Sequence, residues 1–194
     1  SSEQGGRLIK NSMSAAFGLK PSDFHVHVPF MGGGFGGKDD SPCTGPAIML
    51  ALKCKRPVKI VQTREEVFSN GQPRPSAVIY VTDGYNKDGT LAARRVKAFV
   101  NCGAYTTSAL VMLDHSVYGL SGNYRNPNLL VDAYGIYTNT QFNGPYRALG
   151  CELFVYAVER NLDMAAERLG IDKYEIRRRN VLHLGDVDGH GQVV

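Results

Sequence analysis

Glycine, lysine and aspartate are concentrated in one segment of the chain, and together they could bind an anion. Residues 30–40 read FMGGGFGGKDD, in which five of the eleven residues are glycine. Glycine has no Cβ, so backbone N–H groups can approach a ligand closely, although each glycine costs about 0.5–1 kcal/mol relative to alanine in regular structure. The segment therefore predicts a loop that binds a nucleotide phosphate or another anionic cofactor, or that forms a tight turn.

A dinucleotide-binding pattern fits the glycines but lacks its acidic partner. Gly32, Gly34 and Gly37 satisfy G-x-G-x-x-G, as a glycine-rich run easily does. A carboxylate that binds the ribose is expected about 20 residues later, at the end of a second strand. Residues 59–63 read KIVQT and contain no such carboxylate. This absence disfavours a dinucleotide-binding site.

A P-loop pattern also fits only in part. Residues 32–38 satisfy G-x-x-x-x-G-K, after which a P-loop needs serine or threonine to bind Mg²⁺. Asp39 and Asp40 follow instead, and their charges would repel a triphosphate. Phe35 places an apolar ring between glycine pairs, which favours a loop lining a pocket over a plain turn. A nucleotide-binding enzyme and a non-catalytic structural domain remain the alternative functions.

The elements that must position this loop are a mixture of helices and strands. Apolar residues at helical spacing predict helices at 4–18, 44–55, 64–71, 146–169 and 173–184. Alternating or continuous apolar runs predict strands at 23–31, 57–63, 77–83, 91–105 and 129–139. Residues 106–127 are expected to be irregular. The mixture predicts an α+β fold with mixed or antiparallel strands and packed helices.

The elements also define the expected domain organisation. The turn NKDGT at 86–90 joins two predicted strands into a hairpin. We expect 1–194 to form part of one domain, with the glycine loop at 31–38, the hairpin at about 76–104 and the C-terminal helices at about 146–184. The sequence does not begin with methionine, so we expect it to be a piece of a longer protein.

Composition excludes several classes of function. A net charge of +4, with 43% hydrophobic and 21% charged residues, is typical of a globular domain. The basic run at 177–179 lies in a predicted helix and gives little support for a nucleic-acid partner. No apolar run is long enough to predict a membrane span. The cysteines form no C-x-x-C pair, which argues against zinc or iron–sulfur binding and for a reducing, cytoplasmic setting. His25 and His27 are interpreted as the polar face of a strand.

Several segments, in this order and spacing, resemble one family over nearly the whole chain. They are SSEQG, MGGGFGGKDD, RPVKIVQTREE, GYNKDGTLAARRVKAFVNCGAY, YRNPN and NGPYRALGCELFVYAVERNLDMAAERLGIDKYEIRRRNVL. Together they resemble the molybdenum-binding large subunit of the xanthine dehydrogenase and aldehyde oxidase family, the molybdenum hydroxylases. The resemblance implies that the chain is a fragment of the molybdopterin-binding domain of such a subunit.

The resemblance implies which residues contact the cofactor. Gln4 matches a glutamine whose side-chain amide lies beside the oxo ligand of molybdenum, although a polar residue at a helix start is the alternative. Gly33, Gly34, Phe35 and Gly36 match a loop whose backbone N–H groups face the cofactor and the metal's oxygen. Amide dipoles aimed at oxygen in a dry site stabilise negative charge. No side chain is expected to bind the metal directly.

Other matched residues imply contacts with substrate. Asp39 matches a glutamate that touches purines, with N-capping of the next helix as the alternative. Arg147 matches an arginine that orients substrate and flanks the cofactor, which suits a planar guanidinium. His115 and Leu149 replace an arginine and an aromatic residue of purine-oxidising members, so xanthine is disfavoured as substrate. Cys151 lacks the spacing of a copper-binding cysteine and is interpreted as a small buried helix residue.

The implied activity is oxidation of aldehydes or N-heterocycles, with water as the oxygen source. The implied partners are the rest of the large subunit and the iron–sulfur and FAD subunits or domains. The cofactor would be molybdenum–molybdopterin, and the sequence does not decide whether it carries a cytosine dinucleotide. The glutamate base of the family is expected outside this chain. The isolated fragment is therefore expected to be inactive and to lack cofactor.

Overall fold

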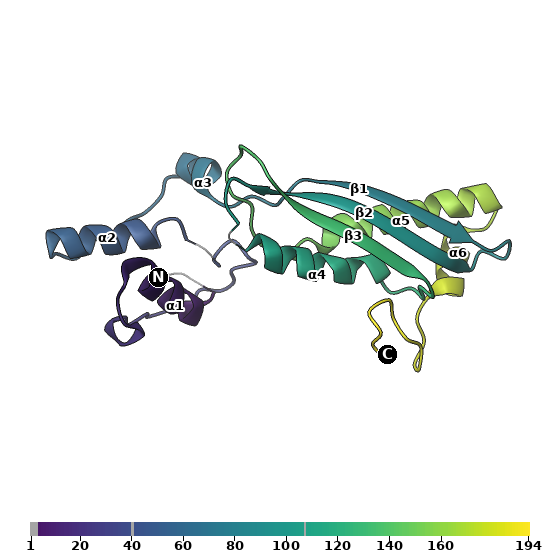
Figure 1. Ribbon diagram of the computed structural model, residues 1–194, viewed down its shortest axis with the longest axis horizontal. Helices are drawn as coiled ribbons and strands as arrows, with labels where there is room; N and C mark the ends of the chain where they lie inside the picture. Colours follow the sequence, from purple (N-terminus) through teal and green to yellow (C-terminus); the bar gives the residue numbers. More distant parts are fainter. Residues whose placement is uncertain (1–3, 40, 107) are drawn as a thin grey trace. The chain divides into compact units, whose positions relative to one another are not determined.

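The computed structural model describes residues 4–39, 41–106 and 108–194. Its backbone divides into two compact units (Figure 1). Unit 1 consists of Ser1–Pro73 and Pro145–Arg147, and unit 2 of Arg74–Gly144 and Ala148–Val194.

Unit 1 contains short helices and long irregular segments. Its helices are α1 (Gly6–Phe17), the 3₁₀ turn η1 (Pro21–Asp23), α2 (Thr44–Cys54) and α3 (Arg64–Asn70). α1 ends where Gly18 adopts a φ of 65°, a conformation that glycine reaches without a Cβ penalty. α3 begins with a capping box, in which the Thr63 side chain accepts from the Glu66 N–H and the Glu66 carboxylate accepts from the Thr63 N–H. Local capping thus sets these helix ends.

Two strands predicted in unit 1 are absent from its described residues. Residues 24–31 and 57–63 have no regular secondary structure. Alternating side chains favour an extended backbone, but a strand also needs a neighbour for its N–H and C=O groups. Without that neighbour, the Phe30 side chain is fully exposed. His25 and His27, interpreted as the polar face of a strand, lie on this irregular segment instead.

Unit 2 is built on a mixed sheet with the order β1-β2-β3. The strands are β1 (Ala77–Tyr85), β2 (Leu91–Gly103) and β3 (Leu129–Tyr137). β1 and β2 are antiparallel and joined by a turn in which Gly89 has a φ of 84°. β2 and β3 are parallel, so a crossover must connect them. The predicted α+β class with mixed strands is confirmed.

The crossover contains a helix that the sequence pattern did not predict. α4 (Ala109–Ser121) occupies the segment expected to be irregular. Its sequence includes serine, histidine and Gly119, which are weak helix formers, so packing rather than propensity stabilises it. A Cβ on Gly119 would lie 2.8 Å from the Cys151 carbonyl oxygen. Glycine at this position therefore allows the backbone of α4 to approach the start of α5 (Cys151–Leu169) closely.

The core of unit 2 lies on one face of the sheet. Val96, Ala98 and Val100 of β2 pack with Leu120 of α4 and Phe154 of α5. A second cluster joins α5 to α6 (Lys173–Asn180). α6 begins at Asp172, whose side chain accepts from the N–H groups of Tyr174 and Glu175. The opposite face of the sheet exposes apolar side chains at Val78, Tyr80, Leu130, Tyr134 and Ile136.

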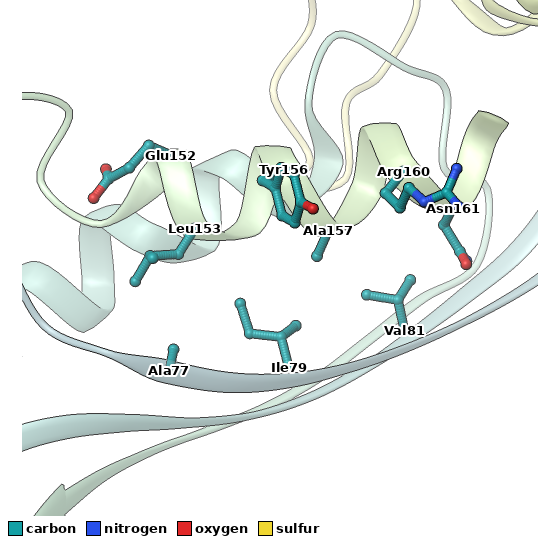
Figure 2. Close-up of a pocket in the computed structure, with 9 residues that line it drawn as sticks. All are labelled: Ala77, Ile79, Val81, Glu152, Leu153, Tyr156, Ala157, Arg160 and Asn161. Atoms are coloured by element: carbon teal, nitrogen blue, oxygen red, sulfur yellow. The ribbon is translucent and has the colours of Figure 1, made fainter. Parts of the chain in front are cut away.

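A groove runs along the edge strand β1. Figure 2 shows that Ala77, Ile79 and Val81 of β1 face Leu153 and Ala157 of α5 across it. Its volume is about 480 Å³. Among the described helices, none has the length and apolar character needed to cross a membrane.

Candidate functional site

The glycine loop contains a tight turn with an unusual backbone. The Gly37 N–H donates to the Gly34 carbonyl at 3.0 Å, and the two residues between them both have positive φ. This combination is typical of a type I′ turn, whose central positions favour glycine or asparagine. Gly36, with a φ of 88°, suits such a position, whereas Phe35, with a φ of 54°, is strained there. The turn holds the Phe35 ring 63% exposed.

Three glycines of the loop have no room for a side chain. A Cβ on Gly33 would lie 2.6 Å from the Phe35 ring, and a Cβ on Gly34 would lie 2.0 Å from the Gln4 amide oxygen. A Cβ on Gly36 would lie 2.5 Å from the Pro145 carbonyl oxygen. Real Cβ atoms do not approach so closely. Close packing of backbone and side chains therefore explains glycine at these three positions of the run.

Gln4 clamps the loop through both its backbone and its side chain. The Gln4 N–H donates to the Lys38 carbonyl at 2.9 Å, and the Gln4 Oε1 accepts from the Gly36 N–H at 2.8 Å. Because the oxygen of a side-chain amide accepts hydrogen bonds and its nitrogen only donates, this bond fixes which way the amide points. The Nε2 is then the remaining donor, and no acceptor for it lies among the described residues. Gln4 thus presents a fixed amide N–H group.

A second glutamine, Gln72, binds the carbonyl group of the same glycine. Its Nε2 donates to the Gly36 carbonyl at 3.0 Å and to the Pro145 carbonyl at 3.3 Å. The Gly36 carbonyl also accepts from the Asp39 N–H at 3.2 Å. Sequence reasoning missed Gln72, because NGQPRP carries no motif that marks it. Its contacts with Gly36 and Pro145 exist only in the fold, which brings segments distant in the sequence together.

Arg147 lies with the glycine loop in unit 1. Its guanidinium is 5.8 Å from the centroid of the Phe35 ring, within the range of a cation–π interaction. Asp39 is half-buried at the end of the loop. Its alternative interpretation as the N-cap of the next helix is wrong, because α2 begins at Thr44 and Cys43 is the N-cap. Gln4, the loop, Asp39 and Arg147 therefore all belong to one unit.

The loop leaves two neighbouring N–H groups for a ligand. Of the four predicted donors, the Gly33 N–H donates to the Met31 carbonyl at 2.7 Å and the Gly36 N–H to Gln4. The N–H groups of Gly34 and Phe35 have no acceptor in the part of the chain that the structure describes. Successive free N–H groups in a left-handed turn form a concavity that binds anions. This pair is the part of the loop that fits an anionic cofactor.

The segment after Arg147 is also strained. Ala148 and Leu149 have φ values of 78° and 51°, and Gly150 follows with 91°. This bend explains why α5 begins at Cys151 rather than at residue 146 as predicted. Among the described residues, four other than glycine have positive φ, and three of them lie in the glycine loop or directly after Arg147. Such strain clusters at functional sites.

The other predicted substrate residues lie in unit 2. His115 is exposed on α4, where its Nδ1 lies 2.8 Å from the Val111 carbonyl oxygen. The Cys151 thiol donates to the His115 carbonyl at 2.9 Å, and burial raises its pKa. A raised pKa leaves less of the thiolate, which is the reactive form of cysteine. Leu149 lies in the strained bend that precedes α5.

No other described feature of the chain carries comparable chemistry. Histidine, cysteine, aspartate and glutamate side chains form no group of three that could hold a metal ion among the described residues. The groove along β1 is lined by aliphatic side chains of β1 and by both aliphatic and polar side chains of α5, including Glu152 and Arg160. The glycine loop combines close backbone approach, paired N–H donors and a cation. Such a loop is suited to binding an anionic group through backbone N–H groups.

Comparison with known proteins identifies the family to which the chain belongs. The family model described as molybdopterin cofactor-binding domain matches residues 1–181. The chain therefore belongs to the molybdopterin cofactor-binding domain family, which confirms the resemblance drawn from the sequence. The free N–H pair, the fixed Gln4 amide and the Arg147 guanidinium fit the anionic oxygens of such a cofactor.

Individual relatives match nearly the whole length of this chain. It is 40% identical over 178 residues to a probable xanthine dehydrogenase subunit of Bacillus subtilis, covering 92% of this chain and 24% of that protein. It is 30% identical over 193 residues to the nicotinate dehydrogenase large molybdopterin subunit of Eubacterium barkeri, covering 100% of this chain and 45% of that protein.

A solved structure shares the fold. The aldehyde oxidoreductase of Desulfovibrio gigas superposes with a TM-score of 0.93 at 27% identity, covering 100% of this chain and 21% of that one. The chain thus spans less than half the length of each of these three proteins. These comparisons give no support to the nucleotide-binding alternative.

Proposed function

We propose that this chain is the cofactor-binding part of the catalytic subunit of a molybdenum-dependent hydroxylase that oxidises aldehydes or N-heterocycles. The observation that carries the proposal is the clamped turn, in which the N–H groups of Gly34 and Phe35 are free of acceptors among the described residues while those around them are bonded. Relatives named as xanthine dehydrogenase, nicotinate dehydrogenase and aldehyde oxidoreductase support this reaction class.

The residues that would hold the cofactor have distinct roles. The N–H groups of Gly34 and Phe35 would bind an anionic oxygen, and the fixed Nε2 of Gln4 would donate to a second one. Arg147 would balance the negative charge. When bound, the molybdenum cofactor supplies the redox centre at which oxygen from water is added to the substrate. These dipoles are held in place before the ligand arrives, so they stabilise charge without reorganising.

The substrate is proposed to be planar. The exposed Phe35 ring and the Arg147 guanidinium beside it suit a flat molecule that carries a carbonyl or carboxylate. Asp39 would accept a hydrogen bond from a ring N–H. His115 and Leu149, which replace the arginine and the aromatic ring expected of purine-oxidising members, support a substrate other than xanthine.

The partners are proposed to be the rest of a larger subunit and the iron–sulfur and FAD components. The share of relatives that this chain covers supports the first part of this proposal. The apolar side chains on the open face of the sheet support it too, because such faces usually mark an interface. We also propose a cytoplasmic setting, supported by the free thiols. By itself the chain is proposed to retain no cofactor.

The test begins with the intact gene product, purified from a host that makes molybdenum cofactor. We expect molybdenum and a pterin in it, measured by mass spectrometry and by fluorescence of the oxidised pterin. The nucleotide released from the pterin distinguishes molybdopterin from its cytosine dinucleotide form. Turnover is then screened with aldehydes and N-heterocycles and a dye acceptor. Absence of both metal and pterin would overturn the proposal.

A glycine variant tests whether the loop holds the cofactor. Gly36→Ala places a Cβ against the Pro145 carbonyl and strains a left-handed residue by about 1–2 kcal/mol, so we expect bound molybdenum to fall about tenfold. Gly45→Ala is the matched control in unit 1, because its Cβ would meet no atom within 4 Å. Equal molybdenum contents in the two variants would show that the loop does not hold the cofactor.

A further inference from the structure

The glycine loop and the segment that carries Arg147 come from distant parts of the chain, and one side chain bonds to both. The Nε2 of Gln72 reaches the Gly36 carbonyl at 3.0 Å and the Pro145 carbonyl at 3.3 Å. Gly36 in turn donates its N–H to Gln4 at 2.8 Å. Gln72 is therefore connected to Gln4 through a single residue, Gly36, and to Arg147 through a short stretch of backbone.

The orientation of the Gln72 amide follows from these bonds. Two carbonyl oxygens can only be satisfied by the nitrogen of the amide, so its oxygen must face away from them. That Oε1 is buried and has no hydrogen-bond partner among the described residues. Leaving a buried acceptor unpaired is unfavourable. The amide of Gln72 is thus oriented to bridge the two segments, although its oxygen then has no hydrogen bond to a described residue.

Two further contacts join the two segments, one between side chains and one between backbones. The Arg147 guanidinium meets the Phe35 ring at an exposed position, where water screens the attraction. The backbones of Gly36 and Pro145 lie close together because glycine has no Cβ, which would otherwise collide with the Pro145 carbonyl. Among these contacts, the Gln72 amide supplies the directional attraction.

We propose that Gln72 is a positioning residue, which locks the glycine loop to the Pro145–Arg147 segment and so fixes Gln4 and Arg147 relative to each other. The inference rests on the proposed function, because those two residues are the groups assigned to cofactor and substrate. Gln72 itself touches neither. Small displacements of such groups change rates strongly, and 1 Å can cost about a hundredfold. A residue that keeps Gln4 and Arg147 at a fixed separation therefore contributes to the reaction rate.

Three substitutions of Gln72 distinguish the effect of hydrogen-bond donation from the effect of side-chain size. Gln72→Glu keeps the shape but sets a carboxylate against two carbonyl oxygens, and Gln72→Met removes polarity. Gln72→Lys has a similar length and restores an N–H donor. Gln62→Glu is the control, since it makes the same chemical change in unit 1 at a side chain with no hydrogen bond to a described residue. If hydrogen-bond donation by Gln72 holds the two segments together, the lysine variant should behave most like the wild type and the glutamate variant least.

The first measurement is independent of cofactor. In intact gene product made without molybdate, hydrogen exchange is followed in peptides covering 31–39 and 145–147. Loss of the lock should speed exchange of the Gly36 and Asp39 amides about tenfold, the equivalent of one lost hydrogen bond. Gln72→Glu should show this effect, whereas Gln62→Glu should not. If Gln72→Glu exchanges like the wild type, or if lysine behaves like methionine, the proposal is overturned.

The second measurement uses the loaded enzyme. Wild type and Gln72→Glu are compared at equal concentrations of molybdenum-containing enzyme. If Arg147 loses its fixed position, KM should be about tenfold or more higher in Gln72→Glu. A merely structural role would lower the amount of folded enzyme without changing KM.

The two proposals can fail separately. Wild-type protein without molybdenum and pterin overturns the proposed function, whereas unchanged exchange overturns the role of Gln72. If Gln72→Glu does not fold, the lysine and methionine variants decide.

Discussion

The two units of this chain maintain their structures by different means. Of the fifteen buried hydrophobic residues among the described positions, fourteen lie in unit 2 and Ile9 alone lies in unit 1. Unit 2 has a sheet covered on one face by helices, and burial of apolar area stabilises it. Unit 1 exposes large apolar side chains such as Phe30, Phe68 and Leu52. Its glycine loop is fixed by glutamine hydrogen bonds and by backbone contacts.

The difference indicates where stability and chemistry reside. Regions with few buried apolar contacts open most easily, and binding loops are commonly drawn from them. In this chain Gln4, the glycine loop and Arg147 all belong to the unit with the smaller core. We expect the cooperative unfolding transition to report on unit 2, and cofactor retention to report on unit 1. Three comparisons of variants test this division, in order of decreasing effect.

The largest effect is expected at the buried ion pair of unit 2. Arg94 donates to both carboxylate oxygens of Asp83 at 2.8 Å and to the Leu120 carbonyl at 3.1 Å, and both charged side chains are at most 1% exposed. Arg94→Met leaves the Asp83 charge buried without its partner, so we expect a loss of about 3–5 kcal/mol in the free energy of unfolding. Denaturant titration followed by circular dichroism measures it.

The neighbouring arginine supplies the control for this change. Arg95 is exposed on the same strand, and Arg95→Met should change the free energy of unfolding by less than about 0.5 kcal/mol. Adding Asp83→Leu to Arg94→Met removes the stranded charge and should recover much of the loss. If Arg94→Met costs no more than Arg95→Met, the ion pair does not contribute to the core of unit 2.

Matched helix caps in the two units should give an intermediate effect. Asp172 caps α6 in unit 2, and Thr63 caps α3 in unit 1. Replacing an N-cap by alanine costs about 1 kcal/mol. Asp172→Ala should therefore lower the cooperative transition by that amount. Thr63→Ala should leave the transition unchanged and instead speed hydrogen exchange within α3. Equal shifts of one transition would show that the two units unfold together, which would contradict the expected division between them.

Elements set by local chemistry were predictable from the sequence, whereas those set by distant partners were not. The hairpin turn around Gly89 and the capping at Asp172 follow from residues close together in the chain. The helix α4 was not predicted because its weak helix formers depend on packing against α5. The strands expected at 23–31 and 57–63 failed for a related reason. An alternating pattern specifies extension but not a partner.

The candidate site shows the same limit. Composition alone pointed to the glycine loop, since five glycines in eleven residues need a reason. Gln4 and Arg147 were reached only through resemblance to a family. Gln72 had no sequence signal, because its importance depends on carbonyl groups from two other segments. The left-handed bend at Ala148 and Leu149 was also hidden, since neither residue type favours that conformation.

The smallest of the three effects concerns acid, and it should again distinguish the units. Hydrogen bonds from Arg178 and then Arg179 lower the pKa of Glu175 in unit 2 to about 2. The pKa of this carboxyl is thus lower in the folded chain than in the unfolded one. Its contribution to stability is present above about pH 4.5 and is lost as the pH falls towards 2. We expect the melting temperature of wild-type protein to fall between pH 5 and 3 partly for this reason, and Glu175→Gln to reduce that fall.

The control is Glu65→Gln, which removes an exposed carboxylate of unit 1 that forms no ion pair with a described residue. If Glu65→Gln reduces the fall as much as Glu175→Gln does, the acid sensitivity is a general charge effect and does not arise from the ion pairs of unit 2.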